Sequence, residues 1–438
     1  MVVNDFLYPK DLAVEVYHFI LKEEISNKFT IENLTNLFEI MYFASLKTEE
    51  SESISSRITI IDKDSPDPKP PKRIVKDRWS YIKFKEEVEL TIPNLVKISK
   101  AADPKAGSLA VDLSNGKFVI WGMIDQEYHY YNCLLNESEM GPERPGLFEV
   151  IIESLGEISV FKDYRNIASL KKNILINKQN DVLNLGPISN KLGEYLSTYI
   201  DNEAHIVKTS SLEGREPEEV WLKWELVSII CRILINIKEY RHGGAVLFDP
   251  KLDDSFMDLS IKYEITYERI SKSLSEYVRS FVEKRALGYY IRNESGYKND
   301  GNIPYPVFID NECLKIDVEE YKNGLTGAVK FISSLTCVDG LVLFDKNLCV
   351  RGFGVEITAR KEPDVIYLAS EEEISEHDLK KVDYKHFGTR HRSMMRYCYT
   401  HPKSIGFVIS QDGDIRAITN VNGKVIMWEN IKIAQFLR

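Results

Sequence analysis

A chain of 438 residues, 43% hydrophobic and 28% charged, has enough apolar sequence for two or three folded domains, and this composition excludes global disorder. A net charge of −10 argues against broad, nonspecific binding to nucleic acid, which requires a basic surface, so we expect no direct nucleic-acid partner. No run of 18 apolar residues occurs and the first residues are polar, so the sequence predicts neither a membrane span nor a signal peptide, and we expect a cytoplasmic protein.

The first third of the chain changes character twice. Residues 1–60 are predicted to form a helical segment, because apolar residues recur every three or four positions over 12–21 and 31–38. Residues 61–78 are rich in proline and polar residues, which indicates a linker or a long loop. Residues 79–205 contain short apolar runs separated by turn residues, and we expect a β-rich accessory domain there.

Two features of the predicted β-rich domain are specific. Asn115-Gly116 separates two alternating runs, 108–113 and 117–122, which is typical of a β-hairpin. An aromatic stretch follows, and it suits either ordinary strand packing or a platform on which a base stacks. Its members are Tyr128, Tyr130 and Tyr131.

Residues 210–438 mix helical and strand patterns, which predicts an α/β domain. The expected helices run from Pro217 to Ile237, from 267 to 287 and from 318 to 335, and the expected strands cover 245–248, 404–410, 415–420 and 424–428.

The six cysteines are scattered without a C-x-x-C pair, and the eight histidines have no spacing typical of zinc sites. Cys231, Cys337 and Cys349 lie within apolar runs, which predicts buried free thiols.

Two short polar blocks indicate chemistry. The first, Gly388 to Arg392, places a glycine, a hydroxyl and three basic residues where a helix is predicted to begin. Basic residues in a first helical turn oppose the helix macrodipole, whereas a bound phosphate is stabilised there. The second is Asp339-Gly340 on an apolar strand, where a carboxylate at the strand end suits a metal in a nucleotide site. A solvated basic face and a plain turn are the alternative interpretations.

Residues 243–420 resemble the diadenylate cyclase domain. Members of that family begin the domain with a Gly-Ala strand, as in Gly244-Ala245, and continue with an Asp-Gly-Ala motif that Asp339-Gly340-Leu341 matches in part. The family's Gly-Thr-Arg-His-Arg motif is complete at Gly388 to Arg392, and the strand that follows ends at Ser410. The resemblance implies a mixed β-sheet flanked by helices, and an enzyme that condenses two ATP molecules into cyclic di-AMP.

The departures from the family concern its catalytic half. Leu341 stands where the family has alanine, and Gln411-Asp412 stand where it has paired glutamates. The phosphate-binding motif is intact. The alternative function is therefore a catalytically inactive, cyclase-like sensor domain that binds a nucleotide or dinucleotide signal.

The resemblance also implies a site. Asp339 would be the metal ligand and the activator of the attacking hydroxyl, with Mg²⁺ or Mn²⁺ as the cofactor and ATP or a cyclic dinucleotide as the ligand. Because one domain holds one ATP, two domains must face each other, and we expect a homodimer or a higher homo-oligomer. The implied nucleotide-binding residues are Gly340, Leu341, Gly388, Thr389, Arg390, His391, Arg392 and Ser410.

Overall fold

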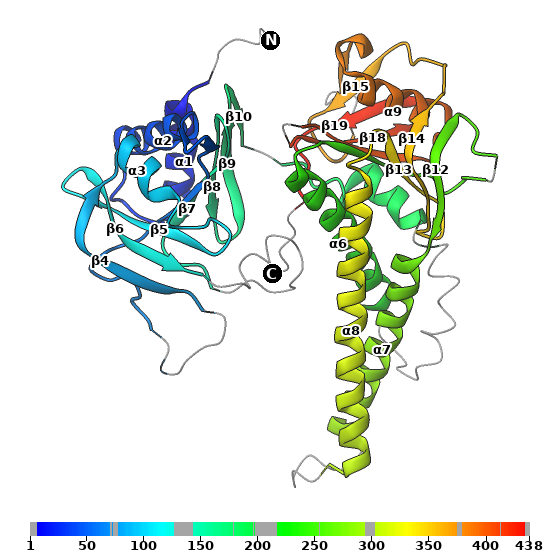
Figure 1. The fold of residues 1–438 in the computed structure, drawn as a ribbon, viewed down its shortest axis with the longest axis horizontal. Coiled ribbons are helices and arrows are strands. Elements are labelled where there is room, and N and C mark those ends of the chain that lie inside the picture. Colours follow the sequence, from blue (N-terminus) through cyan, green and yellow to red (C-terminus); the bar gives the residue numbers. More distant parts are fainter. Residues whose placement is uncertain are drawn as a thin grey trace. The chain divides into compact units, whose positions relative to one another are not determined.

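The protein forms two compact units that divide between Gln179 and Asn180 (Figure 1). Each unit has its own sheet and its own hydrophobic core. The computed structural model describes residues 7–70, 72, 78–126, 143–177, 179–195, 197, 217–253, 255–293, 303–374, 379–411 and 413–433, with only the backbone at 217–222 and 292–293.

In the described part of the first unit, an eight-stranded sheet has the order β10-β9-β8-β7-β3-β5-β6-β4. Its β3 and β5 are parallel, and the other neighbouring strands are antiparallel. The strands are β3 (Ser56–Ile60), β4 (Ser80–Glu89), β5 (Gly107–Ser114), β6 (Lys117–Asp125), β7 (Phe148–Ser154), β8 (Glu157–Lys162), β9 (Arg165–Lys171) and β10 (Ile174–Ile176), and a separate short pair is formed by β1 (Thr48–Glu49) and β2 (Glu52–Ser53).

Three helices pack against this sheet and share its core: α1 (Pro9–Lys22), α2 (Ile31–Ser45) and α3 (Ile92–Ser99). The apolar face of α1 and α2, with Leu12 and Phe38, is buried together with Ile58 of β3 and Val150 of β7. The start of α2 is stabilised by Thr30, whose Oγ1 accepts a hydrogen bond from the Asn33 amide at 3.2 Å. The predicted helical segment and the predicted β-rich domain therefore belong to one core.

The hairpin predicted at Asn115-Gly116 joins β5 to β6. Both turn residues have a positive φ, 50° and 78°, which matches the right-handed twist of the flanking strands. The proline-rich stretch 61–78 connects β3 to β4, two strands of one sheet. Tyr128, Tyr130 and Tyr131 lie outside the described residues.

In the described part of the second unit, a nine-stranded sheet has the order β12-β14-β13-β11-β17-β18-β19-β15-β16. Parallel pairing joins β11 to β13 and β15 to β19, and the remaining neighbours are antiparallel. The strands are β11 (Gly244–Phe248), β12 (Leu259–Tyr267), β13 (Leu341–Phe344), β14 (Val350–Ile357), β15 (Ile366–Ala369), β16 (Leu379–Val382), β17 (Ile405–Ile409), β18 (Ile415–Val421) and β19 (Lys424–Trp428).

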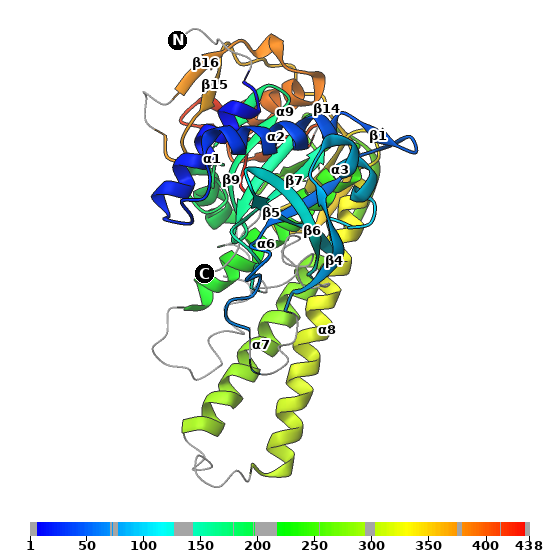
Figure 2. The same ribbon diagram turned by 90° about the vertical axis from the view of Figure 1, so that its left-hand side faces the viewer.

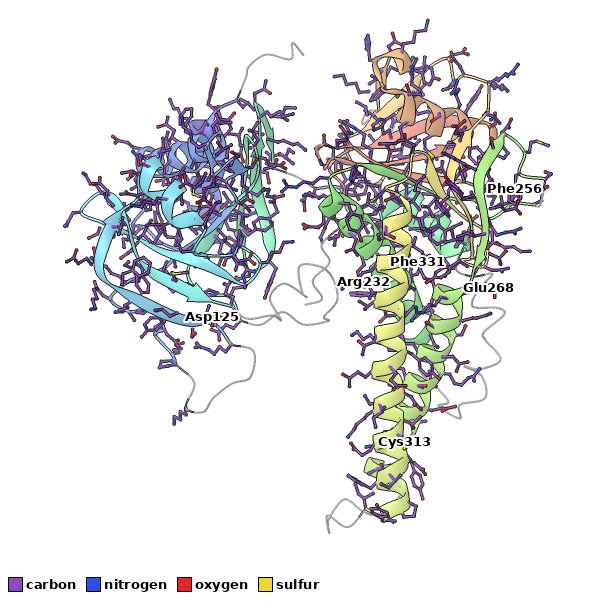
Figure 3. All side chains as sticks on the ribbon, in the orientation of Figure 1. Asp125, Arg232, Phe256, Glu268, Cys313 and Phe331 are labelled. Atoms are coloured by element: carbon purple, nitrogen blue, oxygen red, sulfur yellow. The ribbon has the colours of Figure 1, made fainter. Side chains whose placement is uncertain are left out.

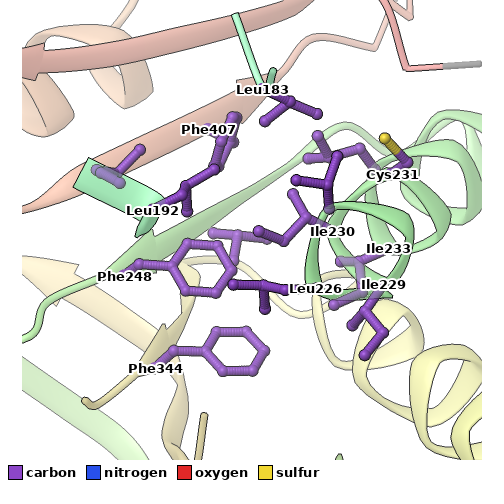
Figure 4. Close-up of a cluster of buried hydrophobic side chains, with 14 of the residues drawn as sticks. Leu183, Leu192, Leu226, Ile229, Ile230, Cys231, Ile233, Phe248, Phe344 and Phe407 are labelled. Carbon is purple, nitrogen blue, oxygen red and sulfur yellow. The ribbon is translucent and has the colours of Figure 1, made fainter. Parts of the chain in front are cut away.

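Alternate residues of each central strand are buried on opposite faces of this sheet. On one face, Phe248 and Phe407 pack with α6 (Pro217–Tyr240), as the close-up in Figure 4 shows. On the other face, Leu247 and Val408 pack with Met394 and the rest of the apolar side of α9 (Thr389–Thr400). A short 3-10 turn, η2 (Tyr384–His386), precedes α9.

Two long helices, α7 (Arg269–Asn293) and α8 (Tyr305–Leu335), form a hairpin. Figures 1 and 2 both show the two helices side by side, running away from the sheet of the second unit. Only the part nearest the sheet joins the core, through residues such as Leu274, Tyr277 and Leu325. We call this hairpin the arm.

The predicted fold class, α/β with a mixed sheet flanked by helices, is confirmed. The helix predicted from 318 begins earlier, at Tyr305. Pro306 is in its first turn, where proline is tolerated, and no other proline or glycine interrupts the turns before 318. Cys231 and Cys349 are buried as predicted, but Cys337 is exposed because it follows the end of α8, outside the apolar strand. None of the described helices combines the length and apolarity that crossing a bilayer requires.

Candidate functional site

The predicted helix start at the Gly-Thr-Arg-His-Arg motif is confirmed: Gly388 precedes the first turn of α9. Glycine has no side chain that could cap the free amide groups of this turn, and the first turn contains no acidic residue. Gly388 and Thr389 are exposed, and a Cβ placed on Gly388 would meet open space. The amide groups at this end of the helix are thus available to an anion.

The strand register brings the second block to one end of the sheet. Val246 of β11 pairs with Val342 of β13, and Gly244 pairs with Ile409 of β17. Residues that directly precede β11 and β13, and those that directly follow β17, therefore share this sheet end. Asp339 and Gly340 lie at this end on one side of β11, and Ser410 lies on its other side.

The position of Asp339 differs from the prediction. The sequence placed its carboxylate on an apolar strand, at the strand end typical of metal sites, whereas the structure has it before β13, after α8 ends at Leu335. Asp339 is exposed. Gly340 has a φ of +119°, and a Cβ there would lie 2.5 Å from the carbonyl carbon of Gly354. Only glycine therefore fits at this position, directly before β13.

Arg390 connects α9 to the same sheet end. Gly243 directly precedes β11 with a φ of +64°, and a Cβ built on it would lie 3.1 Å from Nη1 of Arg390 and 3.0 Å from the amide nitrogen of Gln411. The guanidinium group of Arg390 thus lies against the backbone of Gly243. The residue that precedes β11 and the basic motif at the start of α9 therefore meet at this point.

His391 points to a different neighbour. Nη1 of Arg416, on β18, donates a hydrogen bond to its Nε2 at 3.1 Å, and Nε of Arg416 donates to Oε1 of Glu429 at 2.8 Å. Burial, reinforced by Arg416 and Arg390, lowers the pKa of His391 to about 4. The imidazole is therefore neutral at pH 7, and the positive charges around it belong to Arg390 and to Arg416, which is paired with Glu429.

Arg392 does not join this group. Burial raises the pKa of the Tyr384 hydroxyl, and the positive charges of Arg396 and, more weakly, of Arg392 oppose this rise. The Nε atom of Arg392 is buried and finds no hydrogen-bond partner among the described residues. Two of the motif's basic residues therefore have defined neighbours: Arg390 lies against Gly243, and His391 accepts a hydrogen bond from Arg416.

Two further predicted residues have structural partners. Leu341 is buried in the core between the sheet and α9, so a ligand at the sheet end would meet its backbone. The Oγ of Ser410 accepts a hydrogen bond from the amide of Asp414 at 3.1 Å, which closes the turn between β17 and β18. Both assignments as nucleotide-binding residues stay predictions.

The carboxylate of Asp339 is exposed and suits a cation that takes most of its other ligands from phosphate and water. Among the described residues, no group of three or more His, Cys, Asp or Glu side chains is arranged to hold a metal ion by itself. The predicted Mg²⁺ or Mn²⁺ stays a prediction.

The residues that hold α9 against the sheet are not evident from the sequence. The Tyr397 hydroxyl donates a hydrogen bond to Oδ2 of the buried Asp249 at 2.7 Å, and burial together with this carboxylate raises the pKa of Tyr397. The Tyr397 ring stacks on His401 with centroids 4.2 Å apart, and Nε2 of His401 lies 3.1 Å from Oδ2 of Asp258. These contacts fix the position of α9, and hence of Arg390.

The first unit contains a buried polar network on its sheet. Oε1 of Glu149 on β7 accepts hydrogen bonds from Thr59 Oγ1 at 3.2 Å and from Gln126 Nε2 at 3.0 Å, and its other oxygen pairs with Arg144. Thr59 also shares a 2.6 Å hydrogen bond with Ser108. Stability alone does not require such a network, because an apolar core of the same shape is often at least as stable.

Comparison with known proteins gives one match. Residues 24–125 match a family model described as a probable sensor domain, DACNV. This segment lies in the first unit and includes α2, Thr59 and Ser108. No curated protein and no solved structure matches the chain.

Proposed function

We propose that the second unit binds a nucleotide through its phosphates at the N-terminus of α9, and that the first unit is a sensor that regulates it. One observation carries the nucleotide part: the first turn of α9 is open and basic, and Arg390 reaches from it to the sheet end that also holds Asp339. Free amide groups and guanidinium groups together are the usual ligands of phosphate. The similarity of residues 24–125 to a sensor family supports the regulatory part.

The reaction we propose is the condensation of two ATP molecules into cyclic di-AMP, on the basis of the resemblance of residues 243–420 to diadenylate cyclases. Each 3′-oxygen forms a bond to the α-phosphorus of the other ATP, the bond to the β-phosphate breaks, and two pyrophosphates and the two hydroxyl protons are released. In this proposal Arg390 and Arg416 balance phosphate charge, and Asp339 activates the hydroxyl.

A divalent cation fits this arrangement, since one exposed carboxylate with nucleotide phosphates is a common ligand set for Mg²⁺. Asp339 would hold the cation, whose charge would stabilise the phosphates and lower the pKa of the attacking hydroxyl.

The second candidate is a sensor without catalysis, in which both units bind signals. Gln411 favours it, since this neutral side chain follows β17 at the sheet end where cyclases carry a glutamate.

The deciding experiment incubates the purified full chain with ATP and Mg²⁺ or Mn²⁺ and identifies the products by mass spectrometry. We expect cyclic di-AMP with two pyrophosphates per product. If ATP or cyclic di-AMP binds in calorimetry but no product forms, the second candidate is the correct one. If neither ligand binds, the proposed function is wrong in both forms.

A further inference from the structure

The outer half of the arm has no core of its own. On α7 the last buried residue is Val282, and on α8 the first is Leu325. Between them, none of the described residues of 283–291 and 303–324 is buried. The outer half of α8 alone, from Tyr305 to Gly324, spans about 30 Å at about 1.5 Å per residue. Helices in proteins depend mainly on the packing of an apolar face, so this pair of helices needs a further partner.

The exposed side chains of this outer half include large apolar ones. Their exposed fractions run from 37% for Ile309 to 74% for Tyr305. Scattered apolar residues are normal on a protein surface, but a group on one projecting element marks an interaction site. The group consists of Tyr290, Tyr305, Phe308, Ile309 and Ile316, with Ile303 just before the start of α8.

The charges of the two helices identify the partner. Within the outer half, α7 has three basic residues and one acidic residue over 283–293, whereas α8 has two basic and five acidic residues over 305–324. A surface made of one positive and one negative helix is complementary to itself when a two-fold axis brings α7 of one copy onto α8 of the other.

We propose that the outer half of the arm is a self-association surface, on which the arm of a second copy of this chain packs to form an antiparallel four-helix bundle. Two helices about 10 Å wide, one about 30 Å long on α8 and one about 16 Å long on α7, offer about 460 Å² per copy. The resulting total of about 900 Å² is typical of weak, reversible interfaces. The proposal does not depend on the nucleotide site.

Sedimentation equilibrium of the full chain, without nucleotide, tests this surface. We expect a reversible dimer that weakens as salt concentration rises, since charge complementarity contributes. The double variant Phe308→Glu, Ile316→Glu places charges in the apolar group and should raise the dissociation constant at least tenfold. Met257→Glu is the matched control, because Met257 is 67% exposed and lies outside the arm, and it should leave the constant unchanged.

A second measurement does not depend on the folding of that double variant. Cys313 is exposed on the outer half of α8, where Figure 3 labels it. With Cys133 and Cys337 replaced by serine, a spin label on Cys313 should give a dipolar coupling between copies that dilution with unlabelled chain removes. A chain that is monomeric at all concentrations refutes the proposal, and the arm would then bind a different protein. A dimer in which the Cys313 labels show no coupling also refutes it, because association then uses another surface.

Discussion

Nη1 of Arg416 lies 3.1 Å from Nε2 of His391, although one residue is on β18 and the other is in the first turn of α9. A guanidinium group can only donate a hydrogen bond, so Nε2 must accept it and the imidazole must carry its proton on Nδ1. His391 is thus a neutral spacer between the sheet and the helix. The positive charges next to His391 are therefore those of Arg390, within the motif, and of Arg416 on β18, which is paired with Glu429.

This arrangement predicts an acid-sensitive fold. The pKa of His391 is about 4 in the folded protein against an ordinary value of 6.5, so the unfolded chain binds the extra proton first. Stability is therefore fully present above pH 6.5 and falls as the pH drops toward 4. Replacing His391 with glutamine, which still accepts a hydrogen bond but does not titrate, should flatten this part of the profile. Urea unfolding across this pH range measures it, with the exposed His386→Gln as the control.

If His391→Gln keeps the same pH profile as the wild type, another group causes the acid sensitivity and the assigned hydrogen bond does not govern it.

Arg390 should dominate nucleotide affinity. Charge-assisted hydrogen bonds contribute about 1.5–3 kcal/mol each, so Arg390→Ala should weaken ATP binding at least about tenfold, while Arg392→Ala should have the smaller effect because Arg390, and not Arg392, lies against Gly243 at the sheet end. Isothermal calorimetry gives the dissociation constants, and Arg360→Ala at an exposed site serves as the charge-matched control. Equal ATP affinities for the wild type and Arg390→Ala would show that the phosphates bind at another site.

Asp339→Asn separates catalysis from binding. Asparagine keeps the shape of the side chain but loses the charge, so product formation should fall at least about 100-fold while ATP affinity changes much less. Rates are measured by chromatography of cyclic di-AMP at saturating ATP. A variant as fast as the wild type would remove Asp339 from the catalytic assignment, and a wild type without product would make the second candidate function the better account.

Gly243→Ala tests the contact between α9 and the sheet end. Alanine at a φ of +64° costs about 1–2 kcal/mol, and its Cβ would also press on Nη1 of Arg390. Gly423→Ala is the control, because Gly423 has a φ of +82° but open space around its Cβ. Both variants should lose stability in urea titration, Gly243→Ala more than Gly423→Ala because its Cβ would also lie 2.9 Å from the backbone oxygen of Ile409, but only Gly243→Ala should lose ATP affinity. Equal ATP affinities would show that Arg390 can shift without consequence.

Local pattern was sufficient for much of the fold. The alternation in 415–420 and 424–428 predicted β18 and β19, and the apolar periodicity after Pro217 predicted α6, because each element buries the face that its own sequence makes apolar. The first turns of α8, from Tyr305 to Asp317, were not predicted, because none of these residues is buried and no core-facing side marks their sequence as a helix.

The chemical groups of the site can be predicted from the sequence: a helix start with Arg390 and His391, and a carboxylate at Asp339. Which of these groups meet depends on the packing of distant segments. Successive residues of a helix point about 100° apart, so Arg390, His391 and Arg392 reach different neighbours. The partner of His391 is set by strand register, which brings β18 and its Arg416 beside α9 and depends on hydrogen bonds between segments far apart in the chain.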